Sequence, residues 1–404
     1  MSSSTVKDYV VVGAGIVGLS IARELKRRYP ERSILVLEKE SMPGRHASGR
    51  NSGVLHSGIY YPPDSLKARV CTQGAREMAA FCEEHRLPLK RLGKILIPVE
   101  ERDAPQLHVL ASRAKANGVD VERIDAEQLR RMEPDVRSAT GEALFVPQTS
   151  VGSPTAVILA LREEVCRIGV QVECGTGPVM VEPDTRRARW AGNAVSYGHL
   201  VNAAGLHADL MAHEFEVGKS YTLLPFKGLY WKLNPASRIR VNHLVYPVPD
   251  LRVPFLGVHT TTSVEGVTYL GPTAVPAWGR ENYRGWEDVT ASELSRIGGH
   301  LARQFFAGRD GFRRLAWQEG RRYFKPWFAD AARALLPRLE TTDLLPCDKV
   351  GIRAQLLNRV TGRLVNDFVV ERGPSSTHVL NAISPAWTSA FPFARFVTET
   401  FIEK

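Results

Sequence analysis

The stretch DYVVVGAGIVGLSIARELKRRY, residues 8–29, decides the fold of this 404-residue chain. A β-branched run leads into the glycine turn GAGIVG at residues 13–18, and a helical pattern follows. In such a turn Gly13 allows the tight bend, Gly15 lets the backbone approach a pyrophosphate, and Gly18 permits close packing of helix on strand. The N-terminus of the helix then faces the phosphate charge.

A carboxylate completes this pattern. A second buried strand, residues 33–37, ends in Glu38, twenty residues after Gly18. In a βαβ unit this position meets the ribose hydroxyls, so the stretch predicts dinucleotide binding, and Glu38 disfavours a 2′-phosphate. We expect Lys39 to adjoin the same cofactor.

Bulk composition predicts a globular protein of two domains. Hydrophobic residues make up 44% and charged residues 24% of the chain, and its length exceeds what one core usually supports. The net charge is +10, with basic residues dispersed in small groups without interleaved aromatics. We expect a solvated basic surface and no nucleic acid, which leaves anionic substrates and peripheral contact with an acidic membrane open.

The five cysteines have neither metal-ligand spacing nor a C-x-x-C pair. They predict reduced, mostly buried thiols and no metal site. Residues 1–8 lack the order of a signal peptide, and the apolar run 9–22 is too short to span a bilayer. These features predict a cytoplasmic location, with contact at the inner face of the plasma membrane left open.

Further along the chain, apolar spacing predicts alternating helical and strand-rich regions. Helices are expected at 74–85, 104–117, 155–168 and over most of 288–340, and strands at 91–98, 169–174, 194–201, within 221–270, at 350–356 and at 378–382. A closing helix is expected to begin near Pro385, since proline suits a first helical turn. The fold class is therefore α/β, with a Rossmann-like domain and a second domain built on a mixed or antiparallel sheet.

Two polar, glycine-containing stretches narrow the cofactor to a flavin. SGRNSGVLHSGIYY at 48–61 resembles the flavin-contacting loop of the D-amino-acid oxidase superfamily, and VNAAG at 201–205 resembles its second FAD motif. The resemblance implies FAD as cofactor, with a C-terminal helix whose dipole faces the flavin pyrimidine. The cofactor contacts it implies are Arg50, Asn51, Ser52, Gly53, Ala204, Gly205, Ser384 and Pro385.

Within that superfamily the chain is most similar to the L-2-hydroxyglutarate dehydrogenase/oxidase family. The stretches at 48–68, 241–259, 351–355 and 378–390 carry this resemblance over nearly the whole chain. It implies oxidation of L-2-hydroxyglutarate to 2-oxoglutarate, with electrons passed to oxygen or a quinone-linked chain. With the motifs placed, we expect an FAD domain over 1–85, 145–215 and 341–404, and a substrate domain over 86–144 and 216–340.

Two departures from the family pattern bear on the substrate. The family has Arg-Gly-Glu-Tyr where this chain has KGLY at 227–230, and Thr262 replaces a family arginine. A lysine is no equivalent of a bidentate arginine for a carboxylate. An amino acid, a secondary amine or a glycerol phosphate is therefore kept as an alternative substrate. A noncatalytic, nucleic-acid-associated flavoprotein is a more distant alternative.

Oxidation of a 2-hydroxy acid requires a hydride acceptor and a base for the hydroxyl proton. His56 and His259 are the candidate bases, and His56 is preferred because its loop adjoins the cofactor motif. Either histidine could instead be satisfied by backbone hydrogen bonds. A covalent flavin link at His56 also stays open.

The substrate carboxylate needs a cation in the same cavity. Arg353 is the first choice and Lys227 the second, with Arg50 and Lys67 as weaker candidates. Each could be an ordinary surface cation. Tyr60 and Tyr61 are expected to shape the pocket or to pack.

Overall fold

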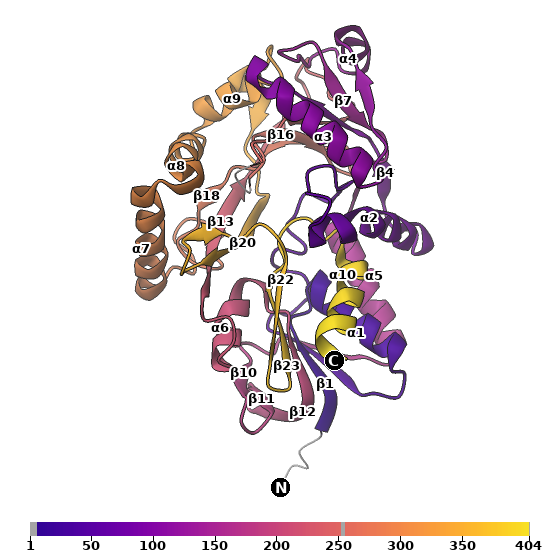
Figure 1. Ribbon diagram of the computed structural model, residues 1–404, viewed down its shortest axis with the longest axis vertical. Helices are drawn as coiled ribbons and strands as arrows, with labels where there is room; N and C mark the ends of the chain where they lie inside the picture. The colour runs from indigo at the N-terminus through magenta and orange to yellow at the C-terminus, as the bar shows by residue number, and fades with distance from the viewer. Residues whose placement is uncertain (1–5, 252–254, 404) are drawn as a thin grey trace.

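The computed structural model describes residues 6–251 and 255–403. An eight-stranded sheet forms the lower half of the molecule in Figure 1, and three smaller sheets lie above it. The order of the main path is β10-β11-β12-β1-β2-β9, with β23 and β22 joined beside β12. These strands are β1 (Val6–Val12), β2 (Ile34–Glu38), β9 (Gln171–Cys174), β10 (Met180–Glu182), β11 (Arg187–Trp190), β12 (Asn193–Asn202), β22 (Val369–Gly373) and β23 (Ser376–Asn381).

The glycine-turn strand β1 is the centre of this sheet. It pairs in parallel with β2 on one side and with β12 on the other. Its side chains alternate between the two faces. Val11 enters a core with four helices, whereas Val10 and Val12 enter a second core on the opposite face. The helices of the first core are α1 (Ile16–Arg28), α2 (Leu66–Glu84), α5 (Pro154–Arg167) and α10 (Ala390–Val397).

The upper half is built on smaller sheets, most of whose pairings are antiparallel. In the sheet nearest the cavity, β13 pairs with β20 over nine residues. In a third sheet β15 runs parallel to β5. The strands are β13 (Tyr221–Leu229), β18 (Val275–Pro276), β20 (Val350–Asn358) and β21 (Arg363–Leu364); β14 (Trp231–Leu233), β16 (His259–Thr262), β17 (Thr268–Gly271) and β19 (Leu344–Leu345); β5 (Lys94–Ile97), β6 (Glu122–Ile124), β7 (Ala143–Val146) and β15 (Leu244–Pro247).

A three-stranded sheet joins the two halves, and further helices cover the outside (Figure 1). This sheet contains β3 (Val54–Leu55), β4 (Leu89–Arg91) and β8 (Ser150–Gly152). The outer helices are α2 (Leu66–Glu84), α3 (Ala104–Ala116), α4 (Ala126–Met132), α6 (Ala208–Glu214), α7 (Ala291–Ala307), α8 (Phe312–Arg321) and α9 (Lys325–Arg333). The expected α/β class, with a Rossmann-like sheet and mixed or antiparallel sheets beside it, is confirmed.

Three sequence predictions need correction. The closing helix α10 begins at Ala390 rather than near Pro385, because residues 384–389 form turns in which Ser389 N–H donates to the Pro385 carbonyl. Helix α2 begins eight residues before the expected start, since the Ser65 side chain caps it by accepting from Ala68 N–H. Only two of the five cysteines, Cys71 and Cys82, are buried, although all five are free thiols.

Candidate active site

A cavity of about 1070 Å³ lies at the carboxyl ends of β1, β2 and β12, below the β13–β20 sheet. This volume is at the upper end of the range for ligand sites, and the position is the usual one for a ligand in a parallel sheet. Most of the predicted site residues line it. They are Gly13, Gly15, Glu38, Lys39, Arg50, Asn51, Ser52, Ala204, Gly205, Ser384 and Pro385, together with His56, His259 and Arg353.

The glycine turn has room for a diphosphate. Gly13 has φ +104°, and a Cβ there would lie 2.5 Å from the Ala203 carbonyl oxygen. A Cβ on Gly18 would lie 1.9 Å from the Gly13 carbonyl oxygen, so only glycine allows this contact. Helix α1 has no side-chain cap on Gly15 and no acidic residue in its first turn. The Ser48 hydroxyl accepts from Ile16 N–H at 3.0 Å, and the dipole of a helix N-terminus that faces a cavity favours an anion.

Glu38 is fixed in place at the end of β2. Its carboxylate accepts hydrogen bonds from Ala14 N–H at 2.8 Å and Glu40 N–H at 3.0 Å. The side chain is buried and still lines the cavity. A carboxylate oriented in this way can accept hydrogen bonds from ribose hydroxyls. The residues at this end of the cavity therefore fit the nucleotide half of FAD.

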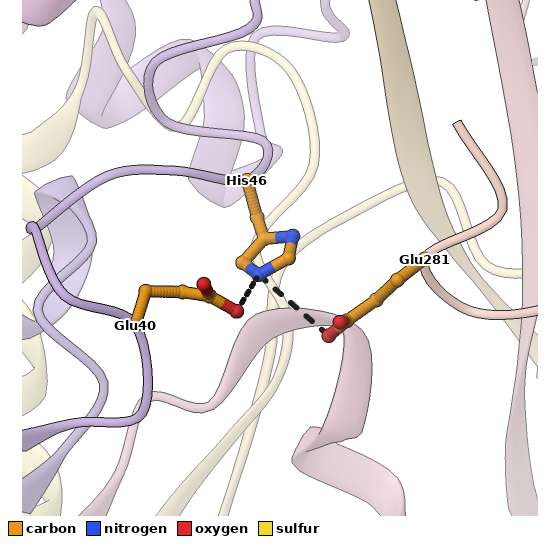
Figure 2. Close-up of side chains that lie close together, drawn as sticks. All are labelled: Glu40, His46 and Glu281. Atoms are coloured by element: carbon orange, nitrogen blue, oxygen red, sulfur yellow. Dashed lines mark hydrogen bonds and ion pairs between the residues drawn. The ribbon is translucent and has the colours of Figure 1, made fainter. Parts of the chain in front are cut away.

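An ion cluster lies beside the nucleotide end of the cavity (Figure 2). Lys39 Nζ lies 3.0 Å from Glu40 Oε1 and 2.5 Å from Glu281 Oε1. His46 Nε2 lies 3.1 Å from Glu40 Oε1 and 3.7 Å from Glu281 Oε1, and His207 Nε2 donates to Glu281 at 2.7 Å. Burial raises the pKa of Glu281, but hydrogen bonds from His207 and Lys39 outweigh it and bring that pKa to about 2.

Glu40, His46 and Glu281 bring their ligand atoms within 4.8 Å of one another, which is close enough for a metal ion. However, the Lys39 ammonium already supplies a cation to both carboxylates. The cluster therefore joins the loop after β2 to a segment more than two hundred residues away. Local sequence patterns could not reveal it.

Glu281 belongs to a segment, residues 280–283, that crosses between the two halves. Arg280 is almost fully buried and donates to both oxygens of Asp209, at 2.7 and 2.9 Å. The Tyr283 hydroxyl lies 2.8 Å from His46 Nδ1. Asn282 Oδ1 accepts from Lys227 Nζ at 2.9 Å. Lys227, the second choice for the substrate cation, is therefore held by this segment and does not line the cavity.

Arg353 is a cation without an anion. It lies on β20, lines the cavity and has its guanidinium carbon 5.2 Å from the centre of the Phe255 ring. Nε donates to Gln355 Oε1 at 3.2 Å, and no carboxylate among the described residues pairs with the guanidinium. Burial lowers the pKa of Arg353 to about 10, so the group stays charged at neutral pH.

Lys67 is a second basic side chain near Arg353. Its side chain is buried, and Nζ lies 5.5 Å from the centre of the Tyr61 ring. Burial, followed by repulsion from Arg353, lowers the pKa of Lys67 to about 7. Within residues 6–251 and 255–403 no carboxylate forms an ion pair with Lys67. The Asp367 carboxylate, which accepts from the backbone N–H groups of Leu66 and Lys67, is a nearby negative charge and partly offsets the lowering of the Lys67 pKa. Lys67 does not line the cavity.

The two candidate bases differ in how they are held. His56 lines the cavity, its Nδ1 is buried, and neither ring nitrogen bonds to a described residue. His259 Nδ1 donates to the Gly257 carbonyl at 2.8 Å, and its ring stacks on Tyr246 at 3.8 Å between centres. Burial lowers the pKa of His56 well below its usual range and that of His259 to about 3. Both imidazoles are therefore neutral at pH 7.

Behind this stack lies Lys94, a residue that sequence reasoning missed. It is fully buried, and its Nζ has no hydrogen-bond partner. The ammonium lies 4.7 Å from the centre of the Tyr246 ring and 5.2 Å from that of Tyr60. Burial lowers the pKa of Lys94 to about 8.

Several predicted site residues stand outside the cavity lining. Tyr60 is buried against Lys94, and Tyr61 lies under Lys67. Gly18 and Gly53 support the backbone instead: a Cβ on Gly53 would lie 2.3 Å from the Gly152 carbonyl oxygen. Residues that the sequence did not indicate, Tyr246, Phe255 and Leu256, form part of the wall.

Comparisons with known proteins agree with this geometry. The model of the FAD dependent oxidoreductase family matches residues 8–400. The chain is 34% identical over 407 residues to the L-2-hydroxyglutarate dehydrogenase of Indibacter alkaliphilus, with 98% of each chain covered. It is 33% identical to the Escherichia coli K12 protein of that name, covering 96% of this chain and 92% of the other.

A solved structure shares the fold. The dithionite-reduced L-α-glycerophosphate oxidase of Mycoplasma pneumoniae, with FAD bound, superimposes with a TM-score of 0.75. The two chains are 20% identical, and the match covers 99% of this chain and 95% of the other. At that identity the likeness shows the architecture alone.

Proposed function

The chain belongs to the FAD-dependent oxidoreductases, within the L-2-hydroxyglutarate dehydrogenase family, and from this premise we propose that it oxidises L-2-hydroxyglutarate to 2-oxoglutarate. FAD is its cofactor, as the resemblance predicted. The observation that carries the substrate proposal is Arg353, a half-buried cation that lines the cavity and forms no ion pair with a carboxylate of the described residues. A desolvated charge without a partner is costly, and a substrate carboxylate would compensate it.

Arg353 holds the substrate carboxylate in this proposal. Its planar guanidinium can donate two parallel hydrogen bonds, which would fix the orientation of C2 in the cavity. Phe255 and Leu256 exclude water from the reacting carbon, since both line the same cavity.

His56 accepts the hydroxyl proton. Its imidazole is neutral and has no hydrogen bond to another described residue, so a ring nitrogen is free to take the proton as the carbonyl forms. Bound FAD supplies the two-electron acceptor for the hydride that leaves C2. His259 keeps its Nδ1 on Gly257 and presents Nε2 as the second candidate.

For the cofactor, we propose that the glycine turn and Glu38 hold the nucleotide half, with Lys39 beside them. Arg50, Asn51 and Ser52 would lie along the flavin half, together with Ala204, Gly205, Ser384 and Pro385. All of these residues except Ala14 and Gly18 of the turn line the cavity. The domain division predicted from the sequence, and a cytoplasmic location, are kept as proposals. Oxygen or a quinone-linked chain would accept the electrons.

An anaerobic titration tests the substrate. The purified FAD protein is mixed with L-2-hydroxyglutarate, and the loss of visible flavin absorbance is recorded. We expect rapid bleaching by the L-enantiomer and none by the D-enantiomer. An amino acid, a secondary amine or glycerol phosphate that bleaches faster would replace the proposed substrate. Failure of every L-2-hydroxy acid to bleach the flavin would refute the proposal.

A further inference from the structure

Lys94 is a charged residue at a core position of a sheet. It begins β5, which pairs with β15 on one side and with β7 on the other. Side chains two residues apart on a strand share a face, and Leu96 belongs to the apolar cluster that contains Tyr60 and Tyr246. The Lys94 side chain extends into the same cluster and is 0% exposed.

The Lys94 ammonium has no compensating charge in the part of the chain that the structure describes. Its Nζ forms no hydrogen bond, and its contacts are with the rings of Tyr246 and Tyr60. The titratable groups around it are Cys71 on α2, Tyr60, Tyr246, His56 and His259. Burial raises the pKa of the Cys71 thiol and of both tyrosines, so none of these groups is an anion at neutral pH. A charge buried in this way costs free energy, which the two rings offset only in part.

The charge persists at neutral pH and acts on the active site. Burial lowers the pKa of Lys94 to about 8, which leaves most of the lysine protonated at pH 7. Burial also lowers the pKa of His56 and of His259, and repulsion from Lys94 lowers both further. Because these histidines line the cavity, the positive potential of Lys94 reaches its substrate end.

Lys94 is one side chain removed from the cavity. The Tyr246 ring that it contacts stacks on His259, and both rings line the cavity. Lys94 itself is not a lining residue. It can therefore act on a bound ligand through its charge but not through a hydrogen bond.

Arg353 accounts for one carboxylate of the proposed substrate. The wall near it includes Phe226, Tyr230, Phe255 and Leu256, and none of these four side chains carries a charge at neutral pH. A second carboxylate against this wall would depend on a positive potential from further away.

We propose that Lys94 is a specificity-determining residue, whose buried ammonium makes the substrate end of the cavity favour a dianionic hydroxy acid over a monoanionic one of the same size. This inference rests on the proposed oxidation of L-2-hydroxyglutarate and names the property that selects it. The Coulomb energy between Lys94 and a ligand is proportional to the charge of the ligand. A dicarboxylate therefore gains twice as much as a monocarboxylate, whereas a change in the shape of the cavity would affect both alike.

Two ligands of nearly equal size test this rule on the full-length FAD protein. One is L-2-hydroxyglutarate, and the other is its analogue with an amide in place of the 5-carboxylate. The dissociation constant of each comes from the concentration dependence of flavin reduction in anaerobic rapid mixing, or from competition if the amide does not reduce the flavin. In Lys94→Met we expect it to rise about tenfold for the dianion and about threefold for the monoanion, because halving the charge halves the Coulomb energy. The limiting rate of reduction should change by less than about threefold.

Lys227→Met is the matched control. It removes a buried lysine whose Nζ has a hydrogen-bond partner in Asn282, and both dissociation constants should change by less than about threefold. The wild type gives a second readout, which remains if Lys94→Met fails to fold. As the pH rises from about 7 to about 9 and Lys94 loses its proton, binding of the dianion should weaken more than binding of the monoanion.

The possible failures are distinguishable. Equal rises of the two dissociation constants in Lys94→Met, or a constant ratio between them in the wild type over this pH range, would overturn the inference. If L-2-hydroxyglutarate binds without reducing the wild-type flavin, the proposed function fails instead. Binding of the two ligands would then still be compared through their effect on the flavin spectrum.

Discussion

The two ends of the cavity differ in how their charges are compensated. At the nucleotide end Lys39, Glu40 and Glu281 form ion pairs with one another, and Arg280 pairs with Asp209. At the substrate end the half-buried Arg353 lines the cavity, and no carboxylate of the described residues forms an ion pair with it. Lys67 and Lys94 are buried outside the cavity lining. Charges that form ion pairs stabilise the folded chain. A desolvated charge without a partner favours the binding of an oppositely charged ligand. The difference indicates where the cofactor is retained and where an anionic substrate enters.

The largest effect is expected from the base. His56→Ala should slow flavin reduction on the order of 10²–10⁴-fold, because a positioned base contributes that much. His259→Ala should have a smaller effect. Since burial keeps His56 neutral, its base form is lost only when the pH falls well below the usual histidine range. Rapid mixing with substrate at several pH values measures the rate of flavin reduction. A larger loss in His259→Ala would transfer the role to that residue.

Removing the substrate cation comes next. Arg353→Met should lower kcat/KM for L-2-hydroxyglutarate by about 10³-fold, or about 4 kcal/mol, because a buried carboxylate would lose its partner. Arg353→Lys should recover part of the loss, since lysine keeps the charge but cannot donate the bidentate pair of hydrogen bonds. Bound FAD should remain in both variants. An unchanged kcat/KM in Arg353→Met would show that Arg353 does not bind the substrate, and it would contradict the difference between the nucleotide and substrate ends of the cavity.

Lys94 should affect stability and its pH dependence. The folded protein holds the pKa of Lys94 at about 8, below its value in the unfolded chain, so the unfolded state binds more protons between these values. Stability should therefore rise with pH from about 8 to 10, by about 3 kcal/mol at most. Lys94→Met should abolish this rise. Denaturant unfolding of the wild type and of Lys94→Met across this pH range measures the free energy of unfolding. The same pH dependence in both proteins would show that Lys94 does not cause the rise.

A moderate effect is expected at the nucleotide end of the cavity, where the charges form ion pairs. Glu281→Gln removes the charge that Lys39 and His207 share, and we expect FAD to dissociate about tenfold faster, an effect of about 1.4 kcal/mol. FAD release is followed by its fluorescence. Glu216→Gln, an exposed change outside the cavity, serves as the control. Equal release rates in the two variants would show that the 280–283 segment does not retain the cofactor.

The smallest effect is expected at Lys227. Because its Nζ donates to Asn282 rather than entering the cavity, Lys227→Met should change KM by less than about threefold. The same steady-state assay measures it. A tenfold rise in KM would mean that Lys227 reaches the substrate and that the family's arginine position is functional here.

The sequence predicted the parts of the site whose residues are neighbours in the chain. The glycine turn and Glu38 follow a spacing in which each residue has a physical role, and the 48–61 loop is one continuous motif. Arg353 and His56 came from the resemblance and from their positions in short motifs. These residues all belong to one cavity in the structure.

The remainder depends on contacts between distant segments. Nothing local marks Glu281 as a partner of Lys39, or Lys94 as a neighbour of Tyr246, because only the fold brings them together. The start of α10 at Ala390 was missed for a different reason: proline at 385 suits a helix start but also suits the turn that precedes it.

A crystal structure of the FAD complex with 2-oxoglutarate would show whether Arg353 binds the substrate carboxylate. We predict that a product carboxylate lies within hydrogen-bond distance of both Arg353 terminal nitrogens, with the carbonyl oxygen beside His56. A carboxylate held by Lys227 instead, or an Arg353 that stays unpaired in the complex, would contradict it.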